Sequence, residues 1–150
     1  MVSAARFHPI GERGVCRFVR AAAYSSTAAE QYFINANQSL LIIQLEGKEA
    51  IDNLDNMLGV EGIDILFIGP YDLSQSLGHP GDTDHPEVIG IMRKIVEKAR
   101  AKGKMLGTFT DTFESAKKWK DAGIQYLSYS VDVGIFTDAC KNLVSSLSRL

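Results

Sequence analysis

The stretch Leu40-Leu41-Ile42-Ile43-Gln44-Leu45-Glu46 decides the fold class of this chain. It is short and rich in branched apolar residues, which predicts a β-strand. Its apolar residues do not alternate with polar ones, so we expect a strand that is buried on both faces, as the strands of parallel sheets are. The stretch therefore indicates an α/β protein built on a parallel sheet.

The rest of the chain repeats the same order of strand and helix. Apolar runs predict further strands at 63–68, 104–109 and 125–131. Apolar residues at helical spacing follow each predicted strand. Such an alternation of four strands with helices predicts a parallel sheet with right-handed crossovers. Periodicity does not distinguish an open sheet from part of a closed barrel, but 150 residues are too few for a complete (β/α)8 barrel of about 250.

Local signals place the boundaries of the helices. Residues 69–81 are rich in turn-forming residues and predict a loop. Asp84 is a candidate N-cap for the next helix, with Pro86 in its first turn. The last helix, Phe136 to Leu147, has an apolar face that includes Cys140, which we expect to be a small core residue.

Composition excludes several classes of function. The chain is 45% hydrophobic with a net charge of -2, which is typical of one globular domain, and it has no basic tract for nucleic acid. No apolar stretch reaches the roughly 18 residues of a membrane span, and the N-terminus does not resemble a secretory signal. Cys16 and Cys140 are far apart, which predicts reduced thiols in a cytoplasmic protein and no zinc site.

Two carboxylates lie where parallel α/β proteins carry their functional groups, at the carboxyl ends of strands. Glu46 ends the first predicted strand, and Asp72 follows the second. Neighbouring strands lie about 4.8 Å apart, so both side chains can reach one ion. Oxygen ligands with open positions suit Mg²⁺ or Mn²⁺. Alternatively, Glu46 faces solvent at a helix start and Asp72 only satisfies local backbone N–H groups.

The sequence strongly resembles the HpcH/HpaI aldolase family along essentially its whole length. The most specific match is residues 59–78, which contain Gly69-Pro70-Tyr71-Asp72. Further matching motifs lie at 6–14, 32–37, 44–46, 78–81 and 85–88. The resemblance implies that the chain is a single partial domain, 1–150, covering about the last four βα units of a TIM barrel.

The resemblance also implies an activity and a site. It implies a lyase that cleaves a hydroxy-2-keto acid to pyruvate, or another 2-keto acid, and an aldehyde. Glu46 and Asp72 match the family's ligands for a divalent ion, which is Mg²⁺ or Mn²⁺, with Co²⁺ as a further option. The ion acts as a Lewis acid that stabilises the enolate. Gln44 matches a position beside the ion that binds substrate or supports the ligands.

The loop that contains Asp72 also resembles the family's substrate-binding segment. Gly69, Pro70 and Tyr71 match residues whose backbone N–H groups hold the carboxylate of the keto acid. Pro70 has no N–H, so Tyr71, Asp72 or their neighbours must donate. Tyr71 is also placed to shape the substrate entrance. At the ends of the last two strands, Asp111 and Asp132 are more typical of helix caps than of site residues.

The catalytic histidine and the substrate arginine of the family are expected on strands that would precede Met1. His8, His79 and His85 do not match that histidine; we expect them in a surface loop, a turn and a helix start. Two alternatives to an aldolase therefore stay open. One is a catalytically incomplete half-barrel that binds metal and forms a homo-oligomer or pairs with a partner, since family members exchange their C-terminal helix. The other is a citrate-lyase-like acyl-CoA lyase.

Overall fold

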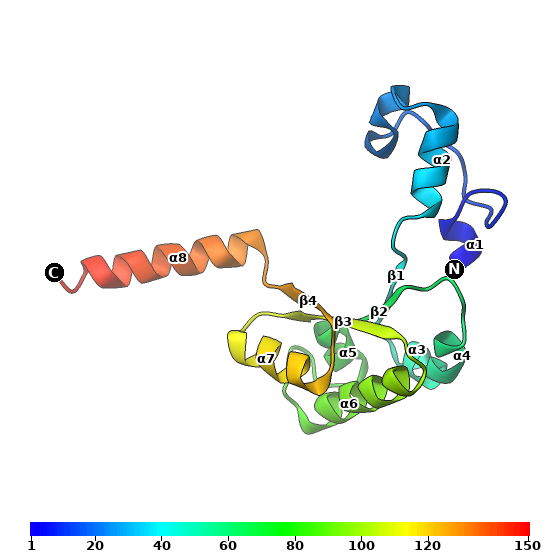
Figure 1. Ribbon diagram of the computed structural model, residues 1–150. Helices are drawn as coiled ribbons and strands as arrows, with labels where there is room; N and C mark the ends of the chain where they lie inside the picture. The colour runs from blue at the N-terminus through cyan, green and yellow to red at the C-terminus, as the bar shows by residue number, and fades with distance from the viewer. The chain divides into compact units, whose positions relative to one another are not determined.

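The computed structural model describes all residues, 1–150, and the chain forms two compact units. One comprises residues 1–43 and 60–65, the other 44–59 and 66–150. The strands β1 (Ile42–Leu45), β2 (Ile65–Ile68), β3 (Met105–Thr110) and β4 (Tyr126–Tyr129) form one sheet in that order (Figure 1). The helices are α1 (Val2–Ala5), η1 (Arg20–Ser25), α2 (Ala29–Asn37), α3 (Lys48–Asp52), α4 (Leu54–Leu58), α5 (Pro70–Ser76), α6 (Pro86–Ala101), α7 (Phe113–Ala122) and α8 (Asp132–Leu147). That the whole chain is one partial domain stays a prediction.

The first unit has a small aromatic core. Phe7 and Tyr32 are buried, and Phe33 packs edge-on against Phe7 with 5.0 Å between ring centroids. Asn37, at the end of α2, accepts a hydrogen bond from the Phe7 N–H at 2.6 Å and donates one back to the Phe7 carbonyl at 3.2 Å. This paired contact fixes α2 against the N-terminal segment because both backbone groups of Phe7 are satisfied by one side chain.

In the second unit, amphipathic helices cover one face of the sheet. The buried residues of α6 repeat at helical spacing and are Val88, Met92, Ile95, Val96 and Ala99. Helix α7 buries Trp119, and both α6 and α7 lie on the same side of β3 and β4 (Figure 1). Strands β3 and β4 pair in parallel, with Gly107 opposite Tyr126. The parallel βα order predicted from sequence is therefore confirmed for this part of the chain.

The two faces of the sheet differ in burial. Along β3, Leu106, Thr108 and Thr110 are buried toward the helices, and Met105 is exposed on the opposite face. The polar side chain of Thr108 can be buried because its hydroxyl donates to the Ile68 carbonyl of β2 at 3.0 Å. Phe67 and Tyr126 meet across Gly107 on the open face. The sheet thus has one packed face and one accessible face.

The prediction that β1 is buried on both faces is wrong for this chain. Ile42 and Gln44 are exposed, and only Leu45 of the strand is fully buried. A strand is buried on both faces only when both faces of its sheet are covered, and here the helices cover one face. The apolar run correctly located the strand, although its bounds are narrower than expected.

Three local predictions also need correction. The expected loop at 69–81 contains helix α5, which begins with Pro70 at its first position. Asp84 is not the cap of α6: Pro86 occupies the first helical position, so the cap is His85, whose ring accepts from the Glu87 N–H. Asp84 instead pairs with Lys118 at 2.7 Å.

Cys140 is exposed and is not a core residue, because α8 has no buried residue at all. The apolar face of α8 is in place, but it is open: Phe136 is 70% exposed and Leu147 65%. The helix begins at Asp132, four residues earlier than the apolar pattern predicted. Asp132 is its first helical residue and not its cap, which is Val131. No helix of the chain is both long enough and apolar enough to cross a membrane.

Candidate metal centre

The second unit brings the ends of β1 and β2 together. The Gly69 N–H, just after β2, donates to the Leu45 carbonyl at the end of β1, at 3.1 Å. The chain then turns directly into α5, because Gly69 caps the helix and Leu73 N–H bonds back to the Gly69 carbonyl at 2.9 Å. Glu46 follows β1 and Asp72 lies in the first turn of α5. Both predicted carboxylates therefore lie at the carboxyl edge of neighbouring strands.

Glu46 carries a buried oxygen that has no donor. Its Oε2 is shielded from solvent and accepts no hydrogen bond. A buried anionic oxygen is costly unless a donor or a cation compensates it. The carboxylate lies against Gly69, where an added Cβ would meet Oε2 at 2.7 Å. The backbone of Gly69 has φ -87, which any residue can adopt, so the lack of space beside Glu46 is what requires glycine here.

A pocket of about 400 Å³ opens beside this carboxylate, on the accessible face of the sheet. Its lining consists of Gln44, Phe67, Gly69, Pro70, Tyr71, Asp72, Phe109 and Ser128. All five residues that we expected around Glu46 are thus brought to one cavity. The combination of a carboxylate, an amide and aromatic walls is typical of a site for a small polar ligand.

Tyr71 is held in this wall by a contact that the sequence did not suggest. Its hydroxyl donates a hydrogen bond to the Asp111 carboxylate, after β3, and its ring lies 6.1 Å from that of Phe109. Asp111 is therefore not the cap of α7, a role that Thr112 fills by accepting from the Ser115 N–H at 3.1 Å. The bond to Asp111, and then burial, raise the pKa of Tyr71.

Removing this bond is expected to lower the pKa of Tyr71. The Asp111 carboxylate disfavours the tyrosinate, so the phenol of the folded chain should ionise at a higher pH than in Asp111→Asn. Any stability from the bond is present below the ordinary pKa of about 10 and is lost as the pH rises through the raised value. Absorbance at alkaline pH, compared with Tyr71→Phe to isolate this residue, checks the shift. An equal pKa of Tyr71 in the unchanged chain and in Asp111→Asn would contradict the prediction.

Two further lining residues were missed by sequence reasoning. Phe109 and Ser128 lie on β3 and β4 and face the pocket. Their signal was the alternation along each strand: residues next to a helix-facing position point to the opposite face.

Each histidine lies in the kind of segment predicted for it. His8 is exposed in the N-terminal segment, and His79 lies in the turn after α5. His85 stands at the start of α6, as expected, although its role as the cap was assigned to Asp84. None of the three lines the pocket beside Glu46.

Strands in the order β1 to β4, helices on one face and polar groups at the carboxyl edge define part of a parallel (β/α)8-type barrel. Residues 1–139 match the sequence profile of the HpcH/HpaI aldolase/citrate lyase family. The chain belongs to this family.

Individual relatives agree with that assignment. The chain is 43% identical over 140 residues to 2-keto-3-deoxy-L-rhamnonate aldolase of Escherichia coli (strain K12), a match that covers 93% of this chain and 52% of the relative. The chain thus spans about half the length of the curated relatives it matches.

Solved structures show the same fold. A HpcH/HpaI aldolase/citrate lyase family protein from Burkholderia cenocepacia J2315 superimposes with a TM-score of 0.86 at 32% identity, over 98% of this chain and 58% of that one. A HpcH/HpaI aldolase from Desulfitobacterium hafniense DCB-2 has a TM-score of 0.79 at 29% identity, over 99% and 58%. The four strands therefore match about half of a TIM barrel, as the motifs implied.

Proposed function

We propose that this chain carries the metal-binding part of a class II aldolase that cleaves a hydroxy-2-keto acid to pyruvate and an aldehyde. The observation that carries the proposal is the buried, unpaired Oε2 of Glu46 beside a pocket that Asp72 also lines. A donor set of two carboxylates fits Mg²⁺ or Mn²⁺, with Co²⁺ as a further option. When bound, such an ion would supply Lewis-acid polarisation of the ketone.

The chain's own residues would position the keto acid. The first N–H groups of a helix lack partners within the helix. In α5 these are the N–H groups of Tyr71 and Asp72, since the first helical residue, Pro70, has no N–H. They can donate hydrogen bonds to the carboxylate of a 2-keto acid. Gln44, whose amide nitrogen lies within 3.6 Å of the Cβ position of Gly69, can donate to a second substrate oxygen. Tyr71 and Phe109 would limit the width of the pocket on the aldehyde side.

The ligand assignment predicts a large loss from small changes. Glu46→Gln and Asp72→Asn remove one charge each at nearly constant volume, so Mn²⁺ binding should weaken by roughly tenfold or more. Release of pyruvate from 4-hydroxy-2-keto acids should be metal-dependent in the unchanged chain and lost in both variants. Glu49→Gln is the matched control, because Glu49 is an exposed carboxylate in the neighbouring helix α3. Tight Mn²⁺ binding by both variants would overturn the assignment.

A second candidate is a half-barrel that binds metal but turns over only when another chain completes it. The observation that favours it is α8, whose apolar residues Phe136, Leu143 and Leu147 are all exposed. A homo-oligomer or a partner would cover such a surface. Metal binding without pyruvate release, in a chain that light scattering shows to be monomeric, would support this candidate. Turnover by the monomeric chain would exclude it.

A further inference from the structure

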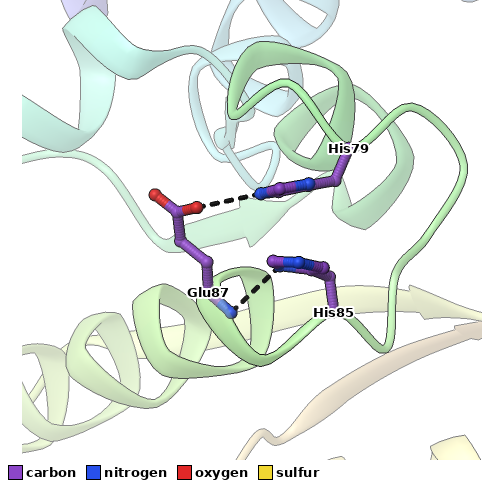
Figure 2. Close-up of side chains that lie close together, drawn as sticks. All are labelled: His79, His85 and Glu87. Atoms are coloured by element: carbon purple, nitrogen blue, oxygen red, sulfur yellow. Dashed lines mark hydrogen bonds and ion pairs between the residues drawn. The ribbon is translucent and has the colours of Figure 1, made fainter.

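A second group of potential ligands lies outside the pocket, where the turn after α5 meets the start of α6. His79, His85 and Glu87 each offer one ligand atom, and these atoms lie within 4.8 Å of one another. Figure 2 shows the two imidazole rings lying face to face, with the Glu87 carboxylate reaching up to His79. The ring centroids are 3.4 Å apart, and His79 Nε2 lies 2.9 Å from Glu87 Oε2. None of the three belongs to the site around Glu46.

The backbone that carries this group is well anchored. The buried Ser74 of α5 accepts the His79 N–H on its carbonyl at 2.8 Å and the Gly81 N–H on its hydroxyl at 3.0 Å. On the other side, the His85 carbonyl accepts from the Ile89 N–H at 3.0 Å, within the first turn of α6. His79 is thus anchored to α5 and His85 to α6, so the fold brings their side chains together in advance of any ligand.

We propose that His79, His85 and Glu87 form a binding site for a transition-metal cation such as Ni²⁺ or Zn²⁺. Two imidazoles and one carboxylate are the donor set that these ions prefer, and Mg²⁺ does not share this preference for nitrogen. Ligands of one such ion lie about 3–4 Å apart for bonds of about 2.1 Å, so a small rotation of the side chains closes the present spacing. Partial exposure of the group leaves positions for water and a route of entry.

Binding would replace two hydrogen bonds. His85 Nδ1 accepts from the Glu87 N–H through its lone pair at 3.3 Å, which is a long bond. The ion would take this lone pair, together with His79 Nε2 and a Glu87 oxygen, in place of the His79–Glu87 pair. The stacked rings must rotate for this to occur. Without a cation, the same contacts simply close the turn onto α6.

The three histidines of the chain allow a direct test. Ni²⁺ is added to the ¹⁵N-labelled full chain in excess Mg²⁺, and the histidine ring signals are followed by NMR. The paramagnetic ion should broaden the signals of His79 and His85 at about one equivalent and leave those of His8 sharp. The same result is expected in the Glu46→Gln background, which makes the outcome independent of the proposed aldolase site.

Three variants complete the test. His79→Asn and Glu87→Gln should each weaken Ni²⁺ binding by roughly tenfold or more. His85→Asn should do the same, although asparagine still caps α6, which circular dichroism verifies. His8→Asn is the matched control because it removes an exposed histidine outside the group. Equal broadening of all three histidines, or Ni²⁺ binding by His79→Asn as tight as in the unchanged chain, would overturn the proposal.

Discussion

Replacing Gly69 with alanine is expected to reduce the affinity for Mn²⁺ by roughly a hundredfold, although no ligand atom is removed. The new methyl group would lie 2.7 Å from Glu46 Oε2 and 3.3 Å from Glu46 Cβ, so the carboxylate must move. Glu46 cannot retreat easily because the preceding Leu45 is buried and its carbonyl is bonded to the Gly69 N–H. Electron paramagnetic resonance of free Mn²⁺ measures the affinity directly.

Gly90→Ala is the matched control for this experiment. Gly90 lies in α6, and an added Cβ there meets no atom within 4 Å. The substitution should leave Mn²⁺ binding unchanged and stabilise the helix by up to about 1 kcal/mol. If Gly69→Ala binds Mn²⁺ as well as Gly90→Ala does, the carboxylate beside Gly69 is not a ligand. Because the backbone angles at Gly69 suit alanine, an unfolded protein is not the expected cause of a loss.

Trp119→Ala is expected to destabilise the second unit by about 3–5 kcal/mol. Trp119 is only 3% exposed and is the one tryptophan of the chain, lying on the face of α7 that packs against β3 and β4. Truncation leaves a cavity in a layer that the surrounding helices cannot readily fill. A loss of this size is a large share of the roughly 5–15 kcal/mol that holds a typical protein folded.

Urea unfolding followed by circular dichroism measures this loss of unfolding free energy. Tryptophan fluorescence cannot be used, because the substitution removes the one tryptophan of the chain. Phe113→Ala is the control: Phe113 begins the same helix and is 75% exposed. It should change the free energy of unfolding by no more than about 0.5 kcal/mol. Equal destabilisation by the two variants would show that α7 does not pack as described.

The strands were predictable because a short run rich in branched apolar residues favours a strand, as in residues 40–46. Helix α5 was missed because Gly69 and Pro70 also favour turns, although proline at a first helical position favours a helix start. The same rule would have moved the cap of α6 from Asp84 to His85, since Pro86 takes the first position. These errors concern competing local signals and not the fold.

The candidate site was predictable only in part. Glu46 and Asp72 could be found because strand ends are where parallel α/β proteins place polar groups, and the family resemblance added Gln44 and Tyr71. The bond from Tyr71 to Asp111 could not be found, because it joins the start of α5 to the segment after β3, 40 residues apart. The unpaired oxygen of Glu46 is likewise a property of packing in three dimensions. Its assignment as a metal ligand stays a prediction.

The two faces of β3 have a consequence for how this protein can change. The helices constrain the buried residues of the strand, which are Leu106, Thr108 and Thr110. Phe109 lines the pocket and is constrained by what binds there. Neighbouring residues of one strand therefore belong to separate selective constraints, one for folding and one for ligand choice. Every second position can therefore be varied while the packing behind the strand stays intact, which makes the open face the natural target for changing what the pocket binds.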